Sequence, residues 1–236
     1  MTAGSRLWGV VPAAGTGRRF GSEVPKQYLF LGEKRIIEHS LAALFGHPAM
    51  RGVALALATD DPWWDEIRPQ PGWRLWRAPG GAERCDSVAN ALEVLAGMAP
   101  ESDWVLVHDA ARPCLRAEDL ERLVDRVLAS GVGGLLAVPV RDTMKRADGE
   151  GRVRETVDRD GLWHAQTPQM FRLGELRRAL AAVRERGLAV TDEAAAMELA
   201  GVRPLLVPGH ADNLKITHAE DLPLARFHLA QQGRLA

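Results

Sequence analysis

Short apolar runs alternate with segments of helical periodicity along most of the chain, and this alternation limits the folds that it can adopt. The runs predicted as strands are residues 7–11, 53–58, 75–78, 104–108, 135–140, 205–207 and 213–216. The segments predicted as helices are residues 35–45, 86–96, 118–129, 173–186, 192–200 and 219–229. Strands that alternate with helices imply crossover βαβ units. The sequence therefore predicts an α/β fold in which helices flank a mostly parallel sheet.

Residues 141–166 interrupt the alternation. This segment, RDTMKRADGEGRVRETVDRDGLWHAQ, is highly charged and contains a DGEG turn signal. It alternates too poorly for a core strand, so it is predicted as a long β-hairpin that projects from the domain as an arm. The chain shows neither an internal repeat nor a long linker, and its 236 residues suit one large α/β domain. We therefore expect a single domain over residues 1–236.

The overall charge and the cysteines narrow the range of partners and compartments. The formal net charge is −1, so the chain lacks the global basic field of proteins that bind nucleic acid or anionic membranes. No apolar run reaches the roughly 20 residues that span a bilayer, and the N-terminus has no long apolar signal region. Cys85 and Cys114 form no CxxC pair and are expected to be buried, reduced thiols. We expect a cytoplasmic enzyme without nucleic-acid or membrane partners.

A glycine-rich loop, PAAGTGRRF, follows the first predicted strand directly. It has neither the G-K-[ST] of a P-loop nor the GxGxxG spacing of a dinucleotide-binding fold. Its small residues, which let backbone N–H groups approach an anion closely, are Ala13, Ala14, Gly15 and Gly17. The cations that match phosphate oxygens are Arg18, Arg19 and Lys26. The loop is predicted to bind the phosphates of a nucleotide, and the alternative is a turn followed by solvated charges.

Two further stretches follow predicted strands, where ligands bind in open α/β sheets. GGAERCDSV places Arg84 and Ser87 on one side of a helix start, and its paired glycines expose backbone groups that could select a nucleobase. The alternative is a flexible turn in which Asp86 or Ser87 caps the helix.

In VLVHDAARP, Asp109 is expected as an exposed carboxylate at a strand end that contacts Mg²⁺. Arg112 could hold an anion nearby. The alternative is that Asp109 caps the next helix. His108 is interpreted as a packed core histidine.

The C-terminal half contains scattered candidates. Lys215 lies inside a predicted strand and therefore requires an anionic partner. Thr191 is predicted to cap the helix that follows it. The histidines show no metal-ligand spacing, so no zinc site is predicted. The tryptophans interpreted as packing residues include Trp63, Trp64, Trp73 and Trp76.

Seven motifs occur in one order along the chain: VVPAAGTGRRF with PKQYL, GGxERxDSV, WVLVHDAARPC, AVPVRDTMKR, TVDRDGLWHAQTPQ, TDEAAAME and ADNLKIT. Together they closely resemble the 2-C-methyl-D-erythritol 4-phosphate cytidylyltransferases of the non-mevalonate isoprenoid pathway, over nearly the whole chain. The resemblance implies a Rossmann-like nucleotidyltransferase fold with CTP and 2-C-methyl-D-erythritol 4-phosphate as substrates. It also implies Mg²⁺, or another divalent cation, and a homodimer with shared active sites.

The resemblance implies roles position by position. CTP would be bound by Pro12, Ala13, Ala14, Gly15, Thr16, Gly17, Arg18, Gly81, Arg84 and Ser87. The transition state would be stabilised by Arg19 and Lys26. The sugar phosphate would be bound by Asp109, Arg112, Thr167 and Lys215, with Thr143 and Arg159 reaching it from the partner subunit. Arg159 and Lys215 would also be catalytic. Ala82 departs from relatives that carry an acid there, which leaves a base or ribose contact from this side chain in question.

The reaction that this resemblance implies is attack of the substrate phosphate on the α-phosphorus of CTP, in line with the departing pyrophosphate. Two anions approach each other, so cations must neutralise the charge that builds up. A phosphate oxygen is already a competent nucleophile, so no general base is required. Two alternatives stay open on the sequence alone. One is another sugar-phosphate nucleotidyltransferase, and the other is a non-catalytic nucleotide-binding module.

Overall fold

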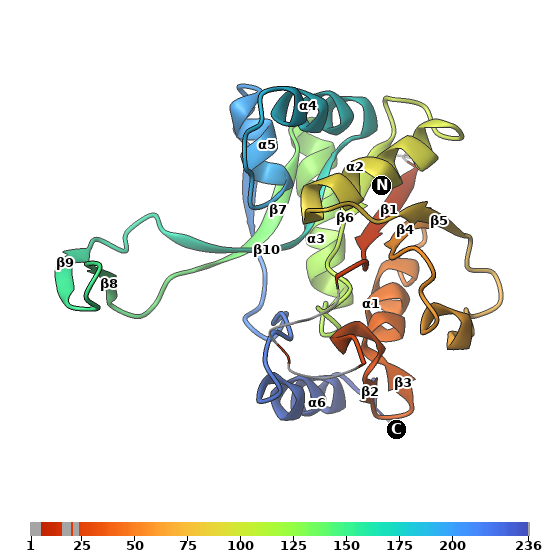
Figure 1. Cartoon of the computed structure of the whole chain (residues 1–236), viewed down its shortest axis with the longest axis horizontal. Coiled ribbons are helices and arrows are strands. Elements are labelled where there is room, and N and C mark those ends of the chain that lie inside the picture. Colours follow the sequence, from red (N-terminus) through yellow and green to blue (C-terminus); the bar gives the residue numbers. More distant parts are fainter. Residues whose placement is uncertain (1–5, 16–19, 21–23, 236) are drawn as a thin grey trace.

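The computed structural model describes residues 6–15, 20 and 24–235, which form a layered α/β domain with one projecting arm (Figure 1). Within these residues a seven-stranded sheet has the order β11-β7-β10-β6-β1-β4-β5. Its strands are β1 (Leu7–Pro12), β4 (Met50–Leu57), β5 (Leu75–Pro79), β6 (Trp104–Val107), β7 (Gly134–Pro139), β10 (Trp163–Arg172) and β11 (Leu205–Pro208). β10 runs antiparallel to both of its neighbours, whereas the other pairs are parallel. The predicted α/β class and mostly parallel sheet are confirmed.

Helices cover both faces of the sheet (Figure 1). They are α1 (Ile36–Phe45), α2 (Arg84–Ala96), α3 (Ala117–Ser130), α4 (Leu173–Glu185) and α5 (Glu193–Leu199). α6 (Asp221–Gln231) packs in a third cluster with Leu31, Ile36 and Ile216, and η2 (Lys26–Tyr28) and η3 (Trp64–Glu66) are short 3-10 helices. Two small antiparallel pairs join β2 (Phe30–Leu31) to β3 (Lys34–Arg35), and β8 (Met144–Ala147) to β9 (Val153–Val157).

The strand period of two divides the core between the two faces. On β1, Leu7 and Val11 belong to the cluster that includes residues of α1 and α3, whereas Trp8 and Val10 belong to the cluster that includes residues of α2, α4 and α5. Gly9 lies on the same face as Leu7 and Val11, and a Cβ there would stand only 2.7 Å from a methyl group of Val53 on β4. Burial on both faces explains why these strands are continuously apolar in the sequence.

The predicted arm projects from the sheet between β7 and β10 (Figure 1). The N–H of Val140 donates to the carbonyl of Leu162 at its base (3.0 Å), and β8 pairs with β9 at its tip. The arm is therefore about four residues shorter than the predicted 141–166, because residues 163–166 already belong to β10.

β10 was not predicted, and its polar sequence explains why. The buried side chains of its second half include Gln166, Thr167 and Gln169, and the strand register shifts between Ala165 and Gln169, around Pro168. Polar side chains and a proline argue against a central strand when only neighbouring residues are considered. Their hydrogen-bond partners lie far away in the sequence, as described below.

Three smaller predictions are wrong. Residues 213–216, all within the described part of the chain, form no strand; the N–H of Ile216 donates to the carbonyl of Ala111, and the segment runs as a loop. The helix predicted from residue 86 starts at Arg84 with Glu83 as its N-cap. The N-cap of α5 is Asp192 rather than Thr191, because the Asp192 carboxylate accepts from the N–H of Ala195.

The tryptophans pack as predicted, Trp73 stacking on Phe45 and Trp64 lying in the core. Both cysteines are free thiols; Cys114 is buried as predicted, but Cys85 is half-buried. Among the described residues, no helix is both long enough and apolar enough to cross a membrane.

Candidate active site

A pocket of about 590 Å³ opens at the carboxyl ends of β1 and β6. Its lining comprises Pro12, Ala13, Ala14, Gly15, Lys26, Gln27, Gly81, Ala82, Glu83, Arg84, Ser87, Asp109, Ala110, Ala111, Lys215 and Thr217. The pocket thus brings together the glycine-rich loop, the GGxERxDSV stretch, the HDAARP stretch and the ADNLKIT stretch. Thr16, Gly17, Arg18 and Arg19, also assigned to this site, lie outside the described residues.

Gln27 anchors the described part of the glycine-rich loop. Its side chain is buried, and its Nε2 donates to the carbonyls of Ala13 (2.8 Å) and Gly15 (3.1 Å). The N–H of Ala13 donates to the carbonyl of Ala56 on β4 (2.8 Å). These bonds tie the loop to η2 and to the sheet. The sequence reasoning missed Gln27, although the PKQYL motif contains it.

The paired glycines allow the second stretch to lie against the loop. A Cβ at Gly80 would stand 2.3 Å from the Cβ of Ala14, and a Cβ at Gly81 would stand 2.2 Å from that of Asp86. The N–H of Gly81 donates to Ser87 Oγ (3.0 Å). A side chain at Gly80 would therefore push the turn away from the glycine-rich loop, and one at Gly81 would push it away from the start of α2.

Asp109 is buried at the centre of a charged cluster, so its predicted exposure is wrong. Its carboxylate is 8% exposed and pairs with Arg84 Nε (3.0 Å), Lys215 Nζ (2.9 Å) and Arg112 Nε (3.4 Å). Burial alone would raise the pKa of this carboxyl, but the cations of Arg84, Lys215 and Arg112 hold that pKa well below its usual range. Asp109 is therefore ionised at neutral pH.

Lys215 has the anionic partner that its sequence context required, although the strand predicted around it is absent. Lys26 lies beside it, because Lys26 Nζ donates to the carbonyl of Ile216 (2.6 Å). Arg112 Nη1 donates to the carbonyl of Asn213 (2.7 Å). Two cations from distant parts of the chain, Lys26 and Arg112, thus meet Lys215 at the 213–217 loop.

His108 and Thr167 form a buried support beneath Asp109. The Asp109 N–H donates to Thr167 Oγ1 (3.0 Å). Burial lowers the pKa of His108 to about 4, so its ring is neutral at neutral pH. In that form Nε2–H donates to the carbonyl of Arg112 (3.0 Å), and Nδ1 accepts from the Thr167 hydroxyl (3.0 Å). His108 is a packed core residue, as predicted, and Thr167 lies behind the pocket lining.

Glu193 was missed as a site residue, since its motif was interpreted as a helix cap. Its buried carboxylate accepts from Arg84 Nη1 (2.6 Å) and Nη2 (3.1 Å). An acid in the first turn of a helix beside alanines was the available signal, but it also fits ordinary capping.

Thr143 and Arg159 do not reach the pocket of their own chain. Both are exposed on the arm, which extends away from the body of the domain (Figure 1). The Arg159 guanidinium donates to the carbonyl of Arg141 within the arm.

The described residues contain no group of three or more side chains of the kinds that ligate metals. Asp109, the residue assigned to Mg²⁺, offers one carboxylate whose oxygens already bind Arg84, Lys215 and Arg112. In this arrangement a divalent cation on Asp109 would lie among three positive charges. The environment of Asp109 therefore does not suit a direct metal ligand.

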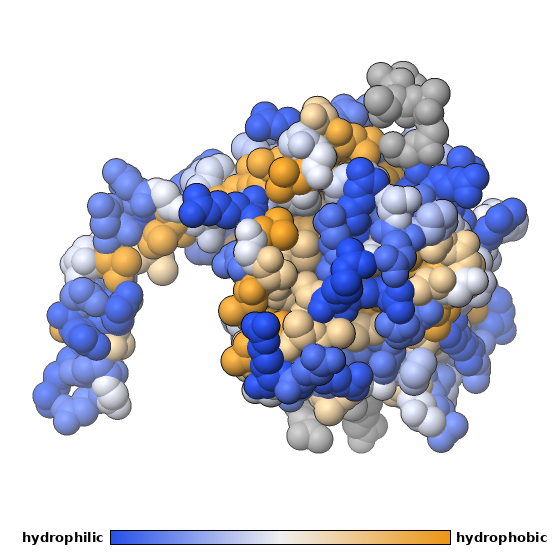
Figure 2. Space-filling model, turned by 90° about the horizontal axis from the view of Figure 1, so that it is seen from above, coloured by the Kyte–Doolittle hydropathy of each residue, from blue (hydrophilic) through white to orange (hydrophobic). Residues whose placement is uncertain are grey.

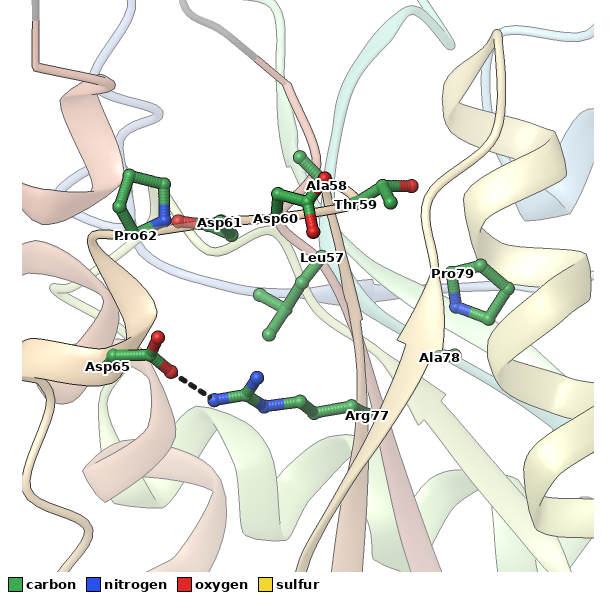
Figure 3. A pocket seen from close by; sticks show the side chains of 10 residues that line it. All are labelled: Leu57, Ala58, Thr59, Asp60, Asp61, Pro62, Asp65, Arg77, Ala78 and Pro79. Atoms are coloured by element: carbon green, nitrogen blue, oxygen red, sulfur yellow. Dashed lines mark hydrogen bonds and ion pairs between the residues drawn. The ribbon is translucent and has the colours of Figure 1, made fainter.

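A second pocket, of about 570 Å³, lies where β4 and β5 end (Figure 3). Asp65 Oδ1 and Arg77 Nη2 pair across it at 2.7 Å, and both side chains are exposed. Asp61 Oδ2 accepts from the Tyr28 hydroxyl (2.7 Å). Its lining carries more acid than base and none of the predicted site residues, which does not suit a triphosphate.

The chain matches known proteins over nearly its whole length. The profile of the family IspD, 2-C-methyl-D-erythritol 4-phosphate cytidylyltransferase, matches residues 7–231. The chain belongs to this family. Two relatives with the same name come from Pseudomonas putida (strain GB-1), 55% identical over 93% of this chain and 94% of the relative, and from Ectopseudomonas mendocina (strain ymp), 54% identical over 98% of each.

Solved structures of the cytidylyltransferase family share the fold. A 4-diphosphocytidyl-2C-methyl-D-erythritol synthase is 42% identical with a TM-score of 0.83, over 97% of this chain and all of that one. The Francisella tularensis cytidylyltransferase is 34% identical with the same TM-score, over 95% of this chain and all of that one. The Rossmann-like nucleotidyltransferase fold expected from the motifs is therefore confirmed, and so is the class of enzyme.

Proposed function

We propose that the chain transfers the cytidylyl group of CTP to 2-C-methyl-D-erythritol 4-phosphate, giving 4-diphosphocytidyl-2-C-methyl-D-erythritol and pyrophosphate. The observation that carries this proposal is the convergence of four family motifs on one pocket at the carboxyl edge of the sheet. Membership of the cytidylyltransferase family gives the same activity.

The chemical step exchanges one phosphorus–oxygen bond for another. A phosphate oxygen of the sugar phosphate attacks the α-phosphorus of CTP, and the bond from that phosphorus to the β-phosphate bridging oxygen breaks. Negative charge accumulates as the two anions meet, so preorganised cations lower the barrier. Lys26 and Lys215 line the pocket and can supply them, while Arg112 lies outside the lining and pairs with Asp109.

The two substrates would occupy different parts of the pocket. The glycine-rich loop would bind CTP together with Gly81 and Ser87. Lys26 and Arg19 would neutralise the negative charge on the oxygens of the five-coordinate transition state. Lys215 and Arg112, both paired with Asp109, would bind and orient the acceptor phosphate. Mg²⁺ that accompanies CTP would neutralise part of the triphosphate charge, a role that requires no contact with Asp109.

The acceptor end of the site would be completed by a second subunit. Thr143 and Arg159 carry polar groups on an arm that projects away from its own pocket. Pairing of two chains would place these groups at the neighbouring site, and closed two-fold assembly is the commonest way in which identical chains pair.

A turnover assay tests the proposed function. Purified protein with CTP, Mg²⁺ and 2-C-methyl-D-erythritol 4-phosphate should release pyrophosphate in equal amount to the CDP-alcohol. Parallel reactions with UTP and ATP, and with other sugar phosphates, test the two selectivities. Comparable turnover with another triphosphate or acceptor would support a different nucleotidyltransferase. Nucleotide binding without any pyrophosphate release would support a non-catalytic module.

A further inference from the structure

The carboxyl group of Glu193 lies directly behind one wall of the pocket; burial raises its pKa, and the Arg84 guanidinium opposes that rise and favours the charged form. The Glu193 side chain is 1% exposed, and it does not line the pocket, whereas Arg84 does. The Glu193 carboxylate accepts hydrogen bonds from both terminal nitrogens of the Arg84 guanidinium, at 2.6 and 3.1 Å. Such a fork-shaped pair resists rotation of the guanidinium.

The central sheet determines where this carboxylate lies. Gln169 on β10 accepts from the N–H of Ala194 (2.8 Å) and donates to Asp192 Oδ2 (2.9 Å). These two bonds hold the residues on either side of Glu193. The start of α5 is therefore attached to a buried strand rather than to a surface loop.

Arg84 connects Glu193 to Asp109, because its guanidinium bonds to both carboxylates. The Arg84 Nε–H donates to Asp109 Oδ1 (3.0 Å), and the other oxygen of Asp109 pairs with Lys215 Nζ (2.9 Å). The four side chains alternate in sign from α5 to the 213–217 loop. Two of them, Arg84 and Lys215, are positive charges that compete for one carboxylate, Asp109.

We propose that Glu193 is a positioning residue that keeps Asp109 available to Lys215. This proposal rests on the proposed function, in which Lys215 orients the acceptor phosphate. When Glu193 is charged, the guanidinium fork of Arg84 is occupied, so Arg84 reaches Asp109 through Nε alone. Without that charge, the fork can turn to Asp109 and take both of its oxygens, because bidentate pairing with a carboxylate is the geometry that arginine prefers. Lys215 then loses its partner and its place in the pocket.

Steady-state kinetics of Glu193→Gln give the first test. Loss of a charge-assisted buried pair typically corresponds to about a 10- to 100-fold change, and we expect kcat/KM for the sugar phosphate to fall by that amount. The matched control is Glu198→Gln, the same chemical change at an exposed position of the same helix, which should stay within about twofold.

A double-mutant cycle separates positioning from general damage. If Glu193 acts through Lys215, Glu193→Gln should have almost no further effect on kcat/KM in a Lys215→Met background. Equal effects of Glu193→Gln in both backgrounds would overturn the proposal, because the two residues would then act independently.

Chemical labelling of Lys215 gives a readout that does not depend on activity. Acetic anhydride acylates unpaired amines faster than paired ones, and Lys34, an exposed lysine, serves as the internal reference. Glu193→Gln should raise labelling of Lys215 relative to Lys34 several-fold. Unchanged labelling would overturn the positioning role of Glu193 even if the wild-type enzyme is active. Increased labelling of Lys215 in a protein without cytidylyltransferase activity would support the positioning role of Glu193 and reject the proposed function.

A second variant covers the case in which Glu193→Gln does not fold. Replacing both partners, Arg84→Met with Glu193→Met, removes the buried pair without leaving an unpaired charge. Asp109 then keeps Lys215 as its partner, so this double variant should label Lys215 no faster than wild type. Faster labelling in the double variant would contradict the competition between Arg84 and Lys215.

Discussion

At the scale of single residues, the pocket depends on one carboxylate that balances several cations. Asp109 lies beneath Arg84, Arg112 and Lys215, and its backbone N–H is held by Thr167. A strand-end aspartate is usually interpreted as a metal ligand or a helix cap. Asp109 is buried because the 213–217 loop packs over it. No local pattern in the sequence predicts that this distant loop lies there.

Substitution of Asp109 should therefore cost stability, contrary to what its predicted exposure implied. We expect Asp109→Asn to lower the free energy of unfolding by about 3 kcal/mol, because three partly buried cations lose their shared counter-charge. Urea denaturation at pH 7 measures this, with Asp125→Asn on the exposed face of α3 as the control. A loss below about 1 kcal/mol would show that the cations find other partners.

His108 should make stability depend on pH in a defined window. Its pKa is about 4 in the folded chain, against about 6.5 when unfolded, so between these values the unfolded state binds more protons. Stability should fall as the pH drops from about 6.5 to about 4, by about 3 kcal/mol from this residue, and level off below that.

The measurement is denaturant unfolding at several pH values for wild type and His108→Gln. The variant should lose most of this slope, whereas His218→Gln, which changes an exposed histidine, should keep it. Parallel slopes in wild type and His108→Gln would mean that the ring is not buried in its neutral form.

At the scale of elements, prediction succeeded where the local pattern matched the burial. β1, β4 and β6 are apolar on both faces because helices cover both, and their sequences show it directly. β10 was missed because Gln166 and Gln169 bind the distant residues His210 and Asp192. Sequence alone found four of the stretches that line the pocket, but not the bonds from Gln27 and Glu193 that hold them.

The turn before α2 offers a prediction for one element. Gly81→Ala would place a Cβ 2.2 Å from the Cβ of Asp86 and 2.9 Å from its backbone carbon, so the turn, which lines the pocket, must move relative to the start of α2. We expect kcat/KM for CTP to fall by about 10²-fold, as for other displacements of about 1 Å. Gly149→Ala is the matched control, since a Cβ there meets nothing within 4 Å. Equal kinetics for the two variants would exclude Gly81 from the CTP site.

At the scale of the whole molecule, the arm is the feature that a single chain leaves unexplained. An isolated two-stranded hairpin is marginally stable in water, and this one exposes Met144 and Val153. Figure 2 shows hydrophobic residues on the stem of the arm and on the side of the body beside it. The motifs supplied the expectation of a homodimer; the geometry of one chain is consistent with it, since the arm has a surface to cover.

Mixing two inactive variants tests whether the sites are shared. Lys26→Ala would inactivate the site of its own chain, and Arg159→Ala would inactivate the site of the partner. Random pairing after reversible dissociation gives about half heterodimers, each with one intact site, so about a quarter of wild-type activity should return. If Arg159 serves its own chain, every site keeps one defect and the mixture stays inactive despite heterodimers proven by mass spectrometry.

The base of the arm has a consequence for engineering this enzyme. Its two ends are adjacent, joined by the bond from the Val140 N–H to the Leu162 carbonyl, and they continue directly into paired strands of the sheet. The geometry is that of a β-hairpin whose loop has been replaced by a long insert. A two-residue Asn-Gly turn has the backbone twist to join such strands. The arm is thus a stretch of the gene joined to the sheet at one junction, where inserts of other lengths and sequences can be exchanged while the strands of the sheet stay unchanged.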